Sequence, residues 1–278
     1  MSIKPKISII TINYNNSSGL GATIQSVVNQ SYPNIEYVVI DGDSSDNSLD
    51  IIKSYESEIN FWISEPDCGI YNAMNKGLNN ASGLYVLFLN SGDKLHNDEV
   101  ISKMVNNLDD YDLVYGNLQF ISEKERFIRS YPKKLTFQYF LNNRSLPHMA
   151  TLIKRSLFDK VFYYNEDYEI VSDWEFFICT VCKFNATYCH LDILVSDFDT
   201  NGVSNDIESQ DKKQNERTLV LQEHFSTFID DYEDITLLNN NRFKALKVLE
   251  ETTFCKKLNS LWLRLVLFIS KGKTPEQL

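Results

Sequence analysis

Strand-like and helix-like patterns alternate through the first 95 residues of the chain. The clearest strand signal is the apolar run YVLFL at residues 85–89, and similar runs occupy residues 6–12, 35–40 and 61–63. Between them, helical patterns are read at residues 21–29, 48–55 and 70–80. Such apolar runs predict strands buried on both faces, and connections this short predict a parallel sheet with helices on both sides.

Polar loops follow three of these runs. They occupy residues 13–16, 41–46 and 90–93, and the last loop, Asn90-Ser91-Gly92-Asp93, carries one carboxylate. Open α/β sheets bind ligands just beyond the carboxyl ends of their strands, where all three loops are expected to lie. Taken alone, residues 90–93 are more typical of a simple turn than of a ligand site. Three polar loops on one sheet edge favour a metal or phosphate site.

The pattern becomes less regular after residue 110 and predicts a mixed sheet. Strands are expected at residues 112–116, 151–153 and 188–191, and helices at residues 98–107, 135–143, 174–184 and 208–228. The whole predicts an α/β fold with a mostly parallel, Rossmann-like sheet flanked by helices. Residues 1–230 are expected to form one domain with halves at 1–116 and 117–230, followed by a helical tail at 231–278.

Charge is distributed unevenly along the chain. The net charge is −11 and the pI is about 4.9, which argues against a general nucleic-acid binder. Residues 241–278 contain eight Lys/Arg and three Asp/Glu, a net +5, which leaves −16 for residues 1–240. An anionic ligand of this acidic body would need a local cationic device, such as a divalent metal or a helix N-terminus.

The cysteines and the first residues indicate a reducing compartment. Five cysteines lack a compact spacing, and MSIKPKISII has no signal-peptide layout. No apolar run reaches the length of a membrane span. A cytoplasmic protein with free thiols is therefore expected. A zinc site at Cys179, Cys182, Cys189 and His190 is the alternative to buried helical cysteines, which are the default.

Familiar nucleotide motifs are absent or incomplete. There is no GxxxxGK[ST] and no GxSxG elbow. Gly19-Leu20-Gly21-Ala22-Thr23-Ile24 resembles a dinucleotide fingerprint, but its third glycine is Ile24 and six residues separate it from the strand. That fingerprint needs a tight turn directly after the strand, so a dinucleotide site is not favoured.

An ordered set of segments resembles a known family. The segments are ISIITINYN, VVIDGDSSD, SEPDCGIYNAMNKG and ASGLYVLFLNSGD, with further pieces at residues 147–151 and 172–177. In this order they resemble the family 2 glycosyltransferases of the GT-A fold, in the nucleotide-diphospho-sugar transferase superfamily, of the bacterial surface-polysaccharide type. The resemblance implies transfer of a sugar from a nucleotide diphosphate, usually with inversion. It makes residues 1–116 the nucleotide-binding half and residues 117–230 the acceptor half.

The resemblance also implies donor-binding residues. Thr11 and Tyr14 match positions that line the base, where Tyr14 would stack on a pyrimidine, with loop packing as its alternative role. Asp41 matches the acid that accepts from uracil or ribose. The segment beside the ribose and diphosphate supplies Asp67, Gly69, Asn72, Asn75 and Lys76. A solvated helix charge is the alternative reading of Lys76.

The implied metal position departs from the usual Asp-x-Asp pattern. Asn90 and Ser91 match donor-binding positions, and only Asp93 retains a carboxylate as the metal ligand. Because Mg²⁺ takes one or two carboxylates together with substrate phosphates, a divalent cation, Mg²⁺ or Mn²⁺, is still expected.

The implied catalytic base is Asp173, which precedes Trp174 at the start of an expected helix. Inverting transfer needs a carboxylate that takes the proton of the acceptor hydroxyl. Helix capping is the alternative role of Asp173, and Glu175 is the alternative base. His148 is expected to border the donor phosphate or the acceptor.

The last expectations concern the C-terminal tail, at residues 231–278, and the molecules that the chain would bind. Apolar residues between Lys256 and Lys273 fit an interfacial helix on anionic lipid at the inner face of the plasma membrane, or a helix packed on the domain or in a homodimer. A nucleotide-sugar donor, UDP-linked, and a glycan or polyprenyl-linked acceptor are implied. The alternatives are a degenerate scaffold protein and a sugar-1-phosphate nucleotidyltransferase; residues 13–19 lack the basic loop that the latter needs.

Overall fold

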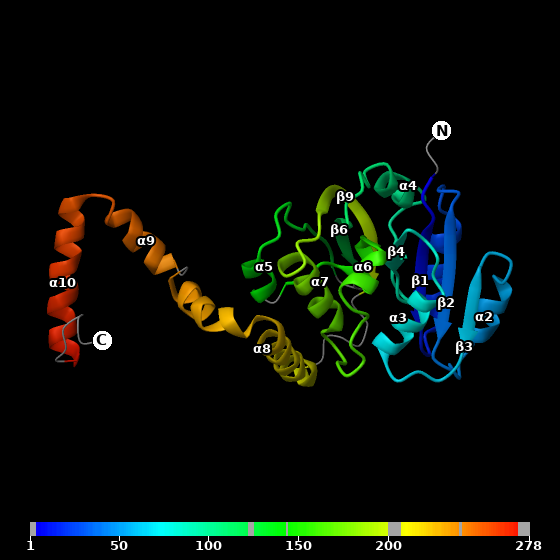
Figure 1. The fold of residues 1–278 in the computed structure, drawn as a ribbon. Helices are drawn as coiled ribbons and strands as arrows, with labels where there is room; N and C mark the ends of the chain where they lie inside the picture. Colours follow the sequence, from blue (N-terminus) through cyan, green and yellow to red (C-terminus); the bar gives the residue numbers. More distant parts are fainter. Residues whose placement is uncertain (1–3, 122–124, 143, 200–206, 239–240, 272–278) are drawn as a thin grey trace. The chain divides into compact units, whose positions relative to one another are not determined.

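Strands from both halves of the chain form one nine-stranded sheet in the computed structural model (Figure 1). The structure describes residues 4–121, 125–142, 144–199, 207–238 and 241–271. The chain divides into two units, Met1–Thr218 and Leu219–Leu278, and each unit is described by itself. The predicted boundary at residue 230 stays a prediction.

The strand order of the sheet is β3-β2-β1-β4-β8-β6-β9-β5, and β7 pairs with β6 beside this path. The strands are β1 (Ile7–Asn13), β2 (Ile35–Asp41), β3 (Phe61–Ser64), β4 (Tyr85–Phe88), β5 (Lys94–Leu95), β6 (Leu113–Ile121), β7 (Arg126–Arg129), β8 (Thr151–Lys154) and β9 (Tyr188–Asp199).

The first four strands pair in parallel, as their short helical connections predict. β1 lies between β2 and β4, with Ile7 opposite both Ile35 and Tyr85. The polar loops at residues 13–16, 41–46 and 90–93 therefore leave the sheet at one edge. β8 then runs antiparallel to both β4 and β6, which gives the mixed second half.

The described residues contain ten α-helices and one short 3₁₀ helix, and the last three α-helices follow the final strand. The helices are α1 (Ser17–Val28), α2 (Ser48–Ser54), α3 (Ile70–Asn79), α4 (Val100–Val105), α5 (Phe137–Leu141), η1 (His148–Ala150), α6 (Ser156–Lys160), α7 (Ser172–Cys182), α8 (Ile207–Leu238), α9 (Asn241–Leu249) and α10 (Thr253–Lys271).

Both faces of the central strands are covered by helices. Ile7 and Ile9 of β1 belong to a buried cluster that includes Ile24 of α1 and Ile101 of α4. On the opposite face Ile10 meets α3 so closely that a Cβ at Gly77 would lie 2.4 Å from its side chain. The alternation of side chains along a strand thus divides β1 between two apolar layers.

Several predicted boundaries differ from the observed ones. The helix expected at residues 21–29 begins at Ser17, because the Asn16 side chain accepts from the backbone N–H of Gly19 at 3.1 Å and caps the first turn. The strand expected at residues 188–191 continues to Asp199 alongside β6. The helix expected at residues 208–228 extends to Leu238, with a non-helical residue at Phe225.

The second unit contains the end of α8, and α9 and α10. In the described part of the chain, no helix is both long and apolar enough to cross a membrane. Lys273 of the predicted basic flank lies outside the described residues.

Candidate active site

The first unit contains an open cleft with a volume of about 1740 Å³. The start of α3, the end of β4, η1 and the start of α7 contribute to its lining. Five of the predicted site residues line it, namely Gly69, Asn90, Asp93, His148 and Asp173. Residues 80 or more positions apart in the sequence thus meet in one cavity.

Asp173 lies in the first turn of α7 with its side chain 19% exposed, so its carboxylate can reach a ligand in the cleft. Its Oδ1 accepts from the backbone N–H of Trp174 at 2.8 Å and from the hydroxyl of Tyr71 at 3.2 Å. Burial raises the pKa of the Asp173 carboxyl, but hydrogen bonds from His148, Trp174 and Tyr71 outweigh it and hold the pKa below its usual value. The group is therefore a carboxylate at neutral pH.

His148 connects Asp173 to the end of β4. Its Nδ1 lies 3.4 Å from Asp173 Oδ2, and its Nε2 lies 3.3 Å from Asn90 Nδ2. Because a carboxylate only accepts and an amide NH₂ only donates, Nδ1 carries the proton and Nε2 accepts. His148 thereby holds one oxygen of the Asp173 carboxylate in place at the cleft.

Asp41 is fully buried and holds the loop after β2. Its Oδ1 accepts from Asn13 Nδ2 at 2.7 Å and from Ser44 Oγ at 2.6 Å. Its Oδ2 accepts from the Ser44 N–H at 3.0 Å and from Ser64 Oγ at 2.7 Å. Burial raises the pKa of Asp41, and these hydrogen bonds outweigh that effect and lower it. Asp41 thus joins the ends of β1, β2 and β3, and its predicted contact with the nucleotide stays a prediction.

Tyr14 and Asp67 approach one another above the end of β2. A Cβ added at Gly42 would lie 2.5 Å from Asp67 Oδ2 and 3.3 Å from the ring of Tyr14. The ring of Tyr14 is 67% exposed, as a base-stacking residue requires. Thr11 differs, because its hydroxyl is fully buried against the hydroxyl of Tyr37 at 3.0 Å.

The predicted ribose and diphosphate segment is held together by its own side chains. Gly69 precedes α3 at φ 120°, a conformation that favours glycine. Asn72 Nδ2 and Asn75 Nδ2 donate to the two oxygens of Glu166, at 2.7 and 2.8 Å. Lys76 pairs with Glu65 at 2.8 Å and donates to the Pro66 carbonyl at 2.9 Å. The two asparagines therefore join α3 to the loop before α7, and Lys76 joins α3 to the loop that precedes it.

The turn after β4 carries the predicted metal position. Asp93 N–H donates to the Asn90 carbonyl at 3.0 Å, and Gly92 adopts a φ of 106°. Ser91 accepts from Asn16 Nδ2 through its carbonyl at 3.0 Å. The buried Asn90 Oδ1 has no hydrogen-bond partner among the described residues, and the Asp93 side chain also lines the cleft. One amide oxygen and one carboxylate at a single turn are hard ligands of the kind Mg²⁺ and Mn²⁺ take, so the residues fit such an ion.

Many residues that line the cleft were not singled out by the sequence, and four of them contact or neighbour the predicted site residues. Tyr71 lies inside the quoted GIYNAMNKG segment, where an aromatic residue beside a predicted ligand loop was the available signal. Glu166, Lys213 and Arg217 gave none, because exposed charges are the ordinary composition of loops and helix surfaces. Their position in the cleft depends on the tertiary fold.

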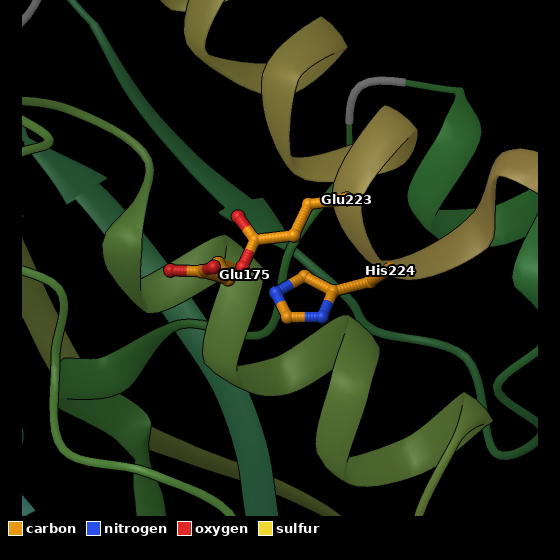
Figure 2. Close-up of side chains that lie close together, drawn as sticks. All are labelled: Glu175, Glu223 and His224. Atoms are coloured by element: carbon orange, nitrogen blue, oxygen red, sulfur yellow. The ribbon is translucent and has the colours of Figure 1, made fainter.

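Glu175, the alternative base, is 3% exposed on α7 and is not among the residues that line the cleft. Figure 2 shows its side chain together with those of Glu223 and His224, consecutive residues of α8. Glu175 belongs to the first unit, whereas Glu223 and His224 belong to the second, so no metal site is assigned to these three residues. Nearby on α7, burial raises the pKa of the Cys182 thiol to about 11, which disfavours the thiolate that zinc would need.

Sequence comparison identifies relatives. The sequence profile of Glycosyl transferase family 2 matches residues 8–162. An "uncharacterized glycosyltransferase" of Mycobacterium tuberculosis is 33% identical over 210 residues, which cover 73% of this chain and 78% of the relative. The UDP-Glc:alpha-D-GlcNAc-diphosphoundecaprenol beta-1,3-glucosyltransferase of Escherichia coli is 32% identical over 172 residues, 58% of this chain and 66% of the relative.

Solved structures show the same fold. TarS 1-349 of S. aureus, in complex with UDP-GlcNAc, superposes with a TM-score of 0.62 at 20% identity, covering 98% of this chain and 77% of that chain. The chain spans 43% of a longer TarS chain. The mannosyltransferase PcManGT from Pyrobaculum calidifontis, in complex with GDP-Man and Mn2+, gives a TM-score of 0.57 at 15% identity, covering 98% and 82%.

These structures are GT-A glycosyltransferases, and the expected GT-A fold is confirmed. The profile covers more than half of the chain, and the segments that suggested the family include Gly69, Asn90, Asp93, His148 and Asp173, which line the cleft. The chain belongs to glycosyl transferase family 2.

Proposed function

We propose that this chain is an inverting glycosyltransferase that moves a sugar from a nucleotide-diphospho-sugar, a UDP-sugar, to a hydroxyl of a glycan or lipid-linked acceptor in bacterial surface-polysaccharide synthesis. The observation that carries the proposal is the ionised Asp173 in the cleft, joined through His148 to the turn after β4. The relatives support it, since the E. coli protein is named for a UDP-sugar donor and a diphosphoundecaprenol acceptor.

Asp173 acts as general base in this proposal. The acceptor hydroxyl gives its proton to the carboxylate while its oxygen attacks the anomeric carbon of the donor. The bond from that carbon to the phosphate oxygen breaks, and the nucleoside diphosphate leaves with the electron pair. A single displacement inverts the anomeric configuration. The lowered pKa of Asp173 keeps the base ready at neutral pH.

Tyr71 and His148 hold the two oxygens of this base. Tyr71 donates to Oδ1 and His148 to Oδ2, which fixes the plane of the carboxylate. Burial raises the pKa of Tyr71 well above its ordinary value, and the charge of Asp173 raises it further, so the hydroxyl stays a donor. We therefore propose positioning roles for both side chains.

The donor is proposed to lie along the edge of β2, β1 and β4. Tyr14 would stack on the base, with the carboxylate of Asp67 beside the same slot above Gly42. Asp41, Asn72, Asn75 and Lys76 support this edge through the contacts described above. Ser91 and Gly69 would bring backbone groups close to the phosphates.

Asp93 and the amide oxygen of Asn90 are proposed to hold Mg²⁺ or Mn²⁺. Such an ion, when bound, neutralises charge that develops on the leaving diphosphate. The mannosyltransferase structure that contains Mn2+ supports the choice of a divalent cation. Asn90 would then contact both the ion, through Oδ1, and His148, through Nδ2.

Donor binding is the first test of this proposal. Calorimetry of the full chain with UDP and a set of UDP- and GDP-sugars, with and without Mn²⁺, should give saturable binding of UDP compounds that Mn²⁺ strengthens. Slow hydrolysis of one UDP-sugar would then name the donor. A lack of binding by every nucleotide, with a folded protein, would contradict the proposal.

We also propose that α10 contacts the anionic inner face of the plasma membrane. Spacings of three and four residues align an exposed apolar face that includes Phe254, Leu258, Leu261, Leu265 and Ile269. The segment Thr253–Lys271 contains four basic residues and no Asp or Glu. An apolar face with basic flanks suits an anionic lipid surface better than an acidic protein surface.

Vesicle flotation of the full chain tests this contact. Trp262, 65% exposed, lies on the apolar side of α10, and Ser260 lies on the polar side. Binding to phosphatidylglycerol vesicles should be lost in Trp262→Asp and largely retained in Ser260→Asp, which adds the same charge. No binding to any vesicle, together with dimers in sedimentation, would assign α10 to a second copy of the chain.

A further inference from the structure

Cationic side chains gather in the part of the cleft beyond Asp173. They are Arg129 of β7, Arg144 of the segment between α5 and η1, and Lys213 and Arg217 of α8, all in the first unit. We refer to these four residues as the cationic wall. Lys212 also lines the cleft but pairs with Glu169. The wall is unexpected in a chain whose net charge is −11.

Three members of the wall, Arg129, Lys213 and Arg217, are close enough for their charges to act on one another. Burial lowers the pKa of Lys213, and the charges of Arg217 and Arg129 lower it further, while Asp173 opposes them. Arg217 is buried, with its guanidinium 4.8 Å from the ring centre of Trp174. Asp173 is the carboxylate that acts on both Lys213 and Arg217, and Glu166 and Glu169 also line the cleft. Cations gathered in one part of a cleft attract an anionic ligand to it.

Exposed apolar residues flank the same wall. Phe127 and Ile128 precede Arg129 on β7, line the cleft, and are 47% and 57% exposed. The ring of Phe127 stacks on Phe120 at 4.8 Å between centroids, and the Arg129 guanidinium lies 4.3 Å from the centre of Phe120. The cleft therefore places the guanidinium of Arg129 beside two solvent-exposed apolar side chains, Phe127 and Ile128.

We infer that the cationic wall holds an anionic group on the acceptor, and that this acceptor is an amphiphile in which a phosphate adjoins an apolar chain. Arginine forks match phosphate oxygens in pairs, and Phe127 and Ile128 would cover the first part of the chain. The inference rests on the proposed function, because it assigns the acceptor side of the same cleft.

Sheet order places the wall away from the proposed donor edge. Tyr14 follows β1 and Asp67 follows β3, whereas Arg129 lies on β7, which pairs with β6. β4 and β8 lie between β1 and β6, and Asp173 stands beside the end of β4 through His148. A phosphate on the wall would therefore approach the base from the side opposite the nucleotide.

Soluble probes test this assignment by calorimetry on the full chain, alone and saturated with UDP. Geranyl phosphate carries the anion and the apolar chain, geraniol only the chain, and methyl β-D-glucuronide a carboxylate on a sugar. Geranyl phosphate should bind in both states, and geraniol should bind at least about tenfold more weakly, as expected for loss of charge-assisted hydrogen bonds. Tighter binding of the glucuronide would overturn the amphiphile in favour of an acidic sugar.

Variants locate the binding site. In Lys213→Gln combined with Arg129→Gln, the affinity for geranyl phosphate should fall by about tenfold or more, with UDP affinity unchanged. Lys160→Gln, an exposed position of α6 outside the cleft, is the matched control. Loss of UDP binding instead would assign the wall to the donor diphosphate, and no effect on either ligand would also contradict the inference. Failure of wild-type protein to bind UDP, with geranyl phosphate still bound, would reject the proposed function and not this site.

Discussion

His148 Nδ1 lies 3.4 Å from Oδ2 of Asp173, and both residues line the cleft of the first unit. The other nitrogen of the ring faces Asn90, in the turn after β4. A carboxylate that serves as base is thereby tied to the turn proposed to hold the leaving diphosphate.

Removal of His148 should change the pH dependence of transfer. Among the groups that lower the pKa of Asp173, His148 has the largest effect. In His148→Ala the effect of burial is opposed by fewer hydrogen bonds, so the pKa of Asp173 rises. In wild type the protonation of Asp173 should reduce kcat/KM only below pH 3.8, the ordinary pKa of the group. In the variant this acid limb should move to higher pH, and the rate at neutral pH should fall on the order of 10²-fold through loss of orientation.

His148→Gln distinguishes orientation from mere packing, because the glutamine amide can again donate to the carboxylate. It should recover part of the rate and return the acid limb toward lower pH. Identical pH profiles of wild type and His148→Ala would show that the contact has no influence on the base.

Asp41 should contribute to stability independently of any ligand. Asp41→Asn replaces one carboxylate oxygen by a donor among groups that all donate, so the free energy of unfolding should fall by about 2–4 kcal/mol. Because the folded pKa is lowered, the stabilisation by wild-type Asp41 is present above pH 3.8 and is lost as pH falls through the folded pKa. Urea unfolding at several pH values measures both effects.

Asp43→Asn is the matched control two residues away. Asp43 is exposed at φ 63°, a conformation that asparagine tolerates equally well, so its substitution should change stability by less than about 0.5 kcal/mol. Equal stabilities of the Asp41 and Asp43 variants would leave Asp41 as a ligand contact only.

Gly42→Ala should weaken nucleotide binding without unfolding the protein. The new methyl group would lie 2.5 Å from Asp67 Oδ2 and 3.3 Å from Tyr14, so the carboxylate at the end of a flexible side chain must move. We expect UDP affinity to fall by about tenfold, the equivalent of one hydrogen bond to a charged group. Gly21→Ala, where the methyl group meets only Ile51 at 3.9 Å, should leave UDP affinity unchanged. Equal UDP affinities for the two variants would show that the uracil base does not bind beside Gly42.

Removal of the divalent cation should abolish transfer and weaken UDP binding. In Asp93→Asn the one carboxylate of the proposed ion site is lost, and the affinity of the UDP complex for Mn²⁺ should fall by about tenfold or more. Electron paramagnetic resonance of free Mn²⁺ measures this affinity without an activity assay. Asp98→Asn, at an exposed acid, is the control. Full activity in EDTA would show that transfer does not require a divalent cation at the turn after β4.

The parallel half of the fold was predictable because local signals were sufficient there. Each strand, β1 to β4, is a continuous apolar run, and each helix between them is a short amphipathic segment. The second half was less accessible, since the continuation of β9 to Asp199 depends on pairing with β6, which lies about 75 residues earlier in the chain. The sequence also contains no clear signal for where some helices begin and end. Asn16, for example, lies in a stretch with the composition of a loop, yet it caps α1.

The candidate site shows the same limit. Asp93, His148 and Asp173 could be picked out because motif and residue type coincide, and the structure brings all three into one cleft. The role of Asp41 as the acceptor of four hydrogen bonds was not accessible, because Asn13 and Ser64 reach it only after β1, β2 and β3 have aligned. The cationic wall was hidden for the same reason, since Arg129 and Lys213 are far apart in the sequence.

The most direct test of the central claim is sugar transfer by Asp173→Asn, compared with wild type and with Asp98→Asn. Asparagine keeps the shape of the side chain and cannot take a proton, so transfer should fall by about 10²–10⁴-fold while UDP affinity and the melting temperature stay near wild type. Asp98→Asn should behave as wild type in all three measurements. Full transfer activity in a folded Asp173→Asn variant would contradict the assignment of Asp173 as the base and with it the proposed mechanism.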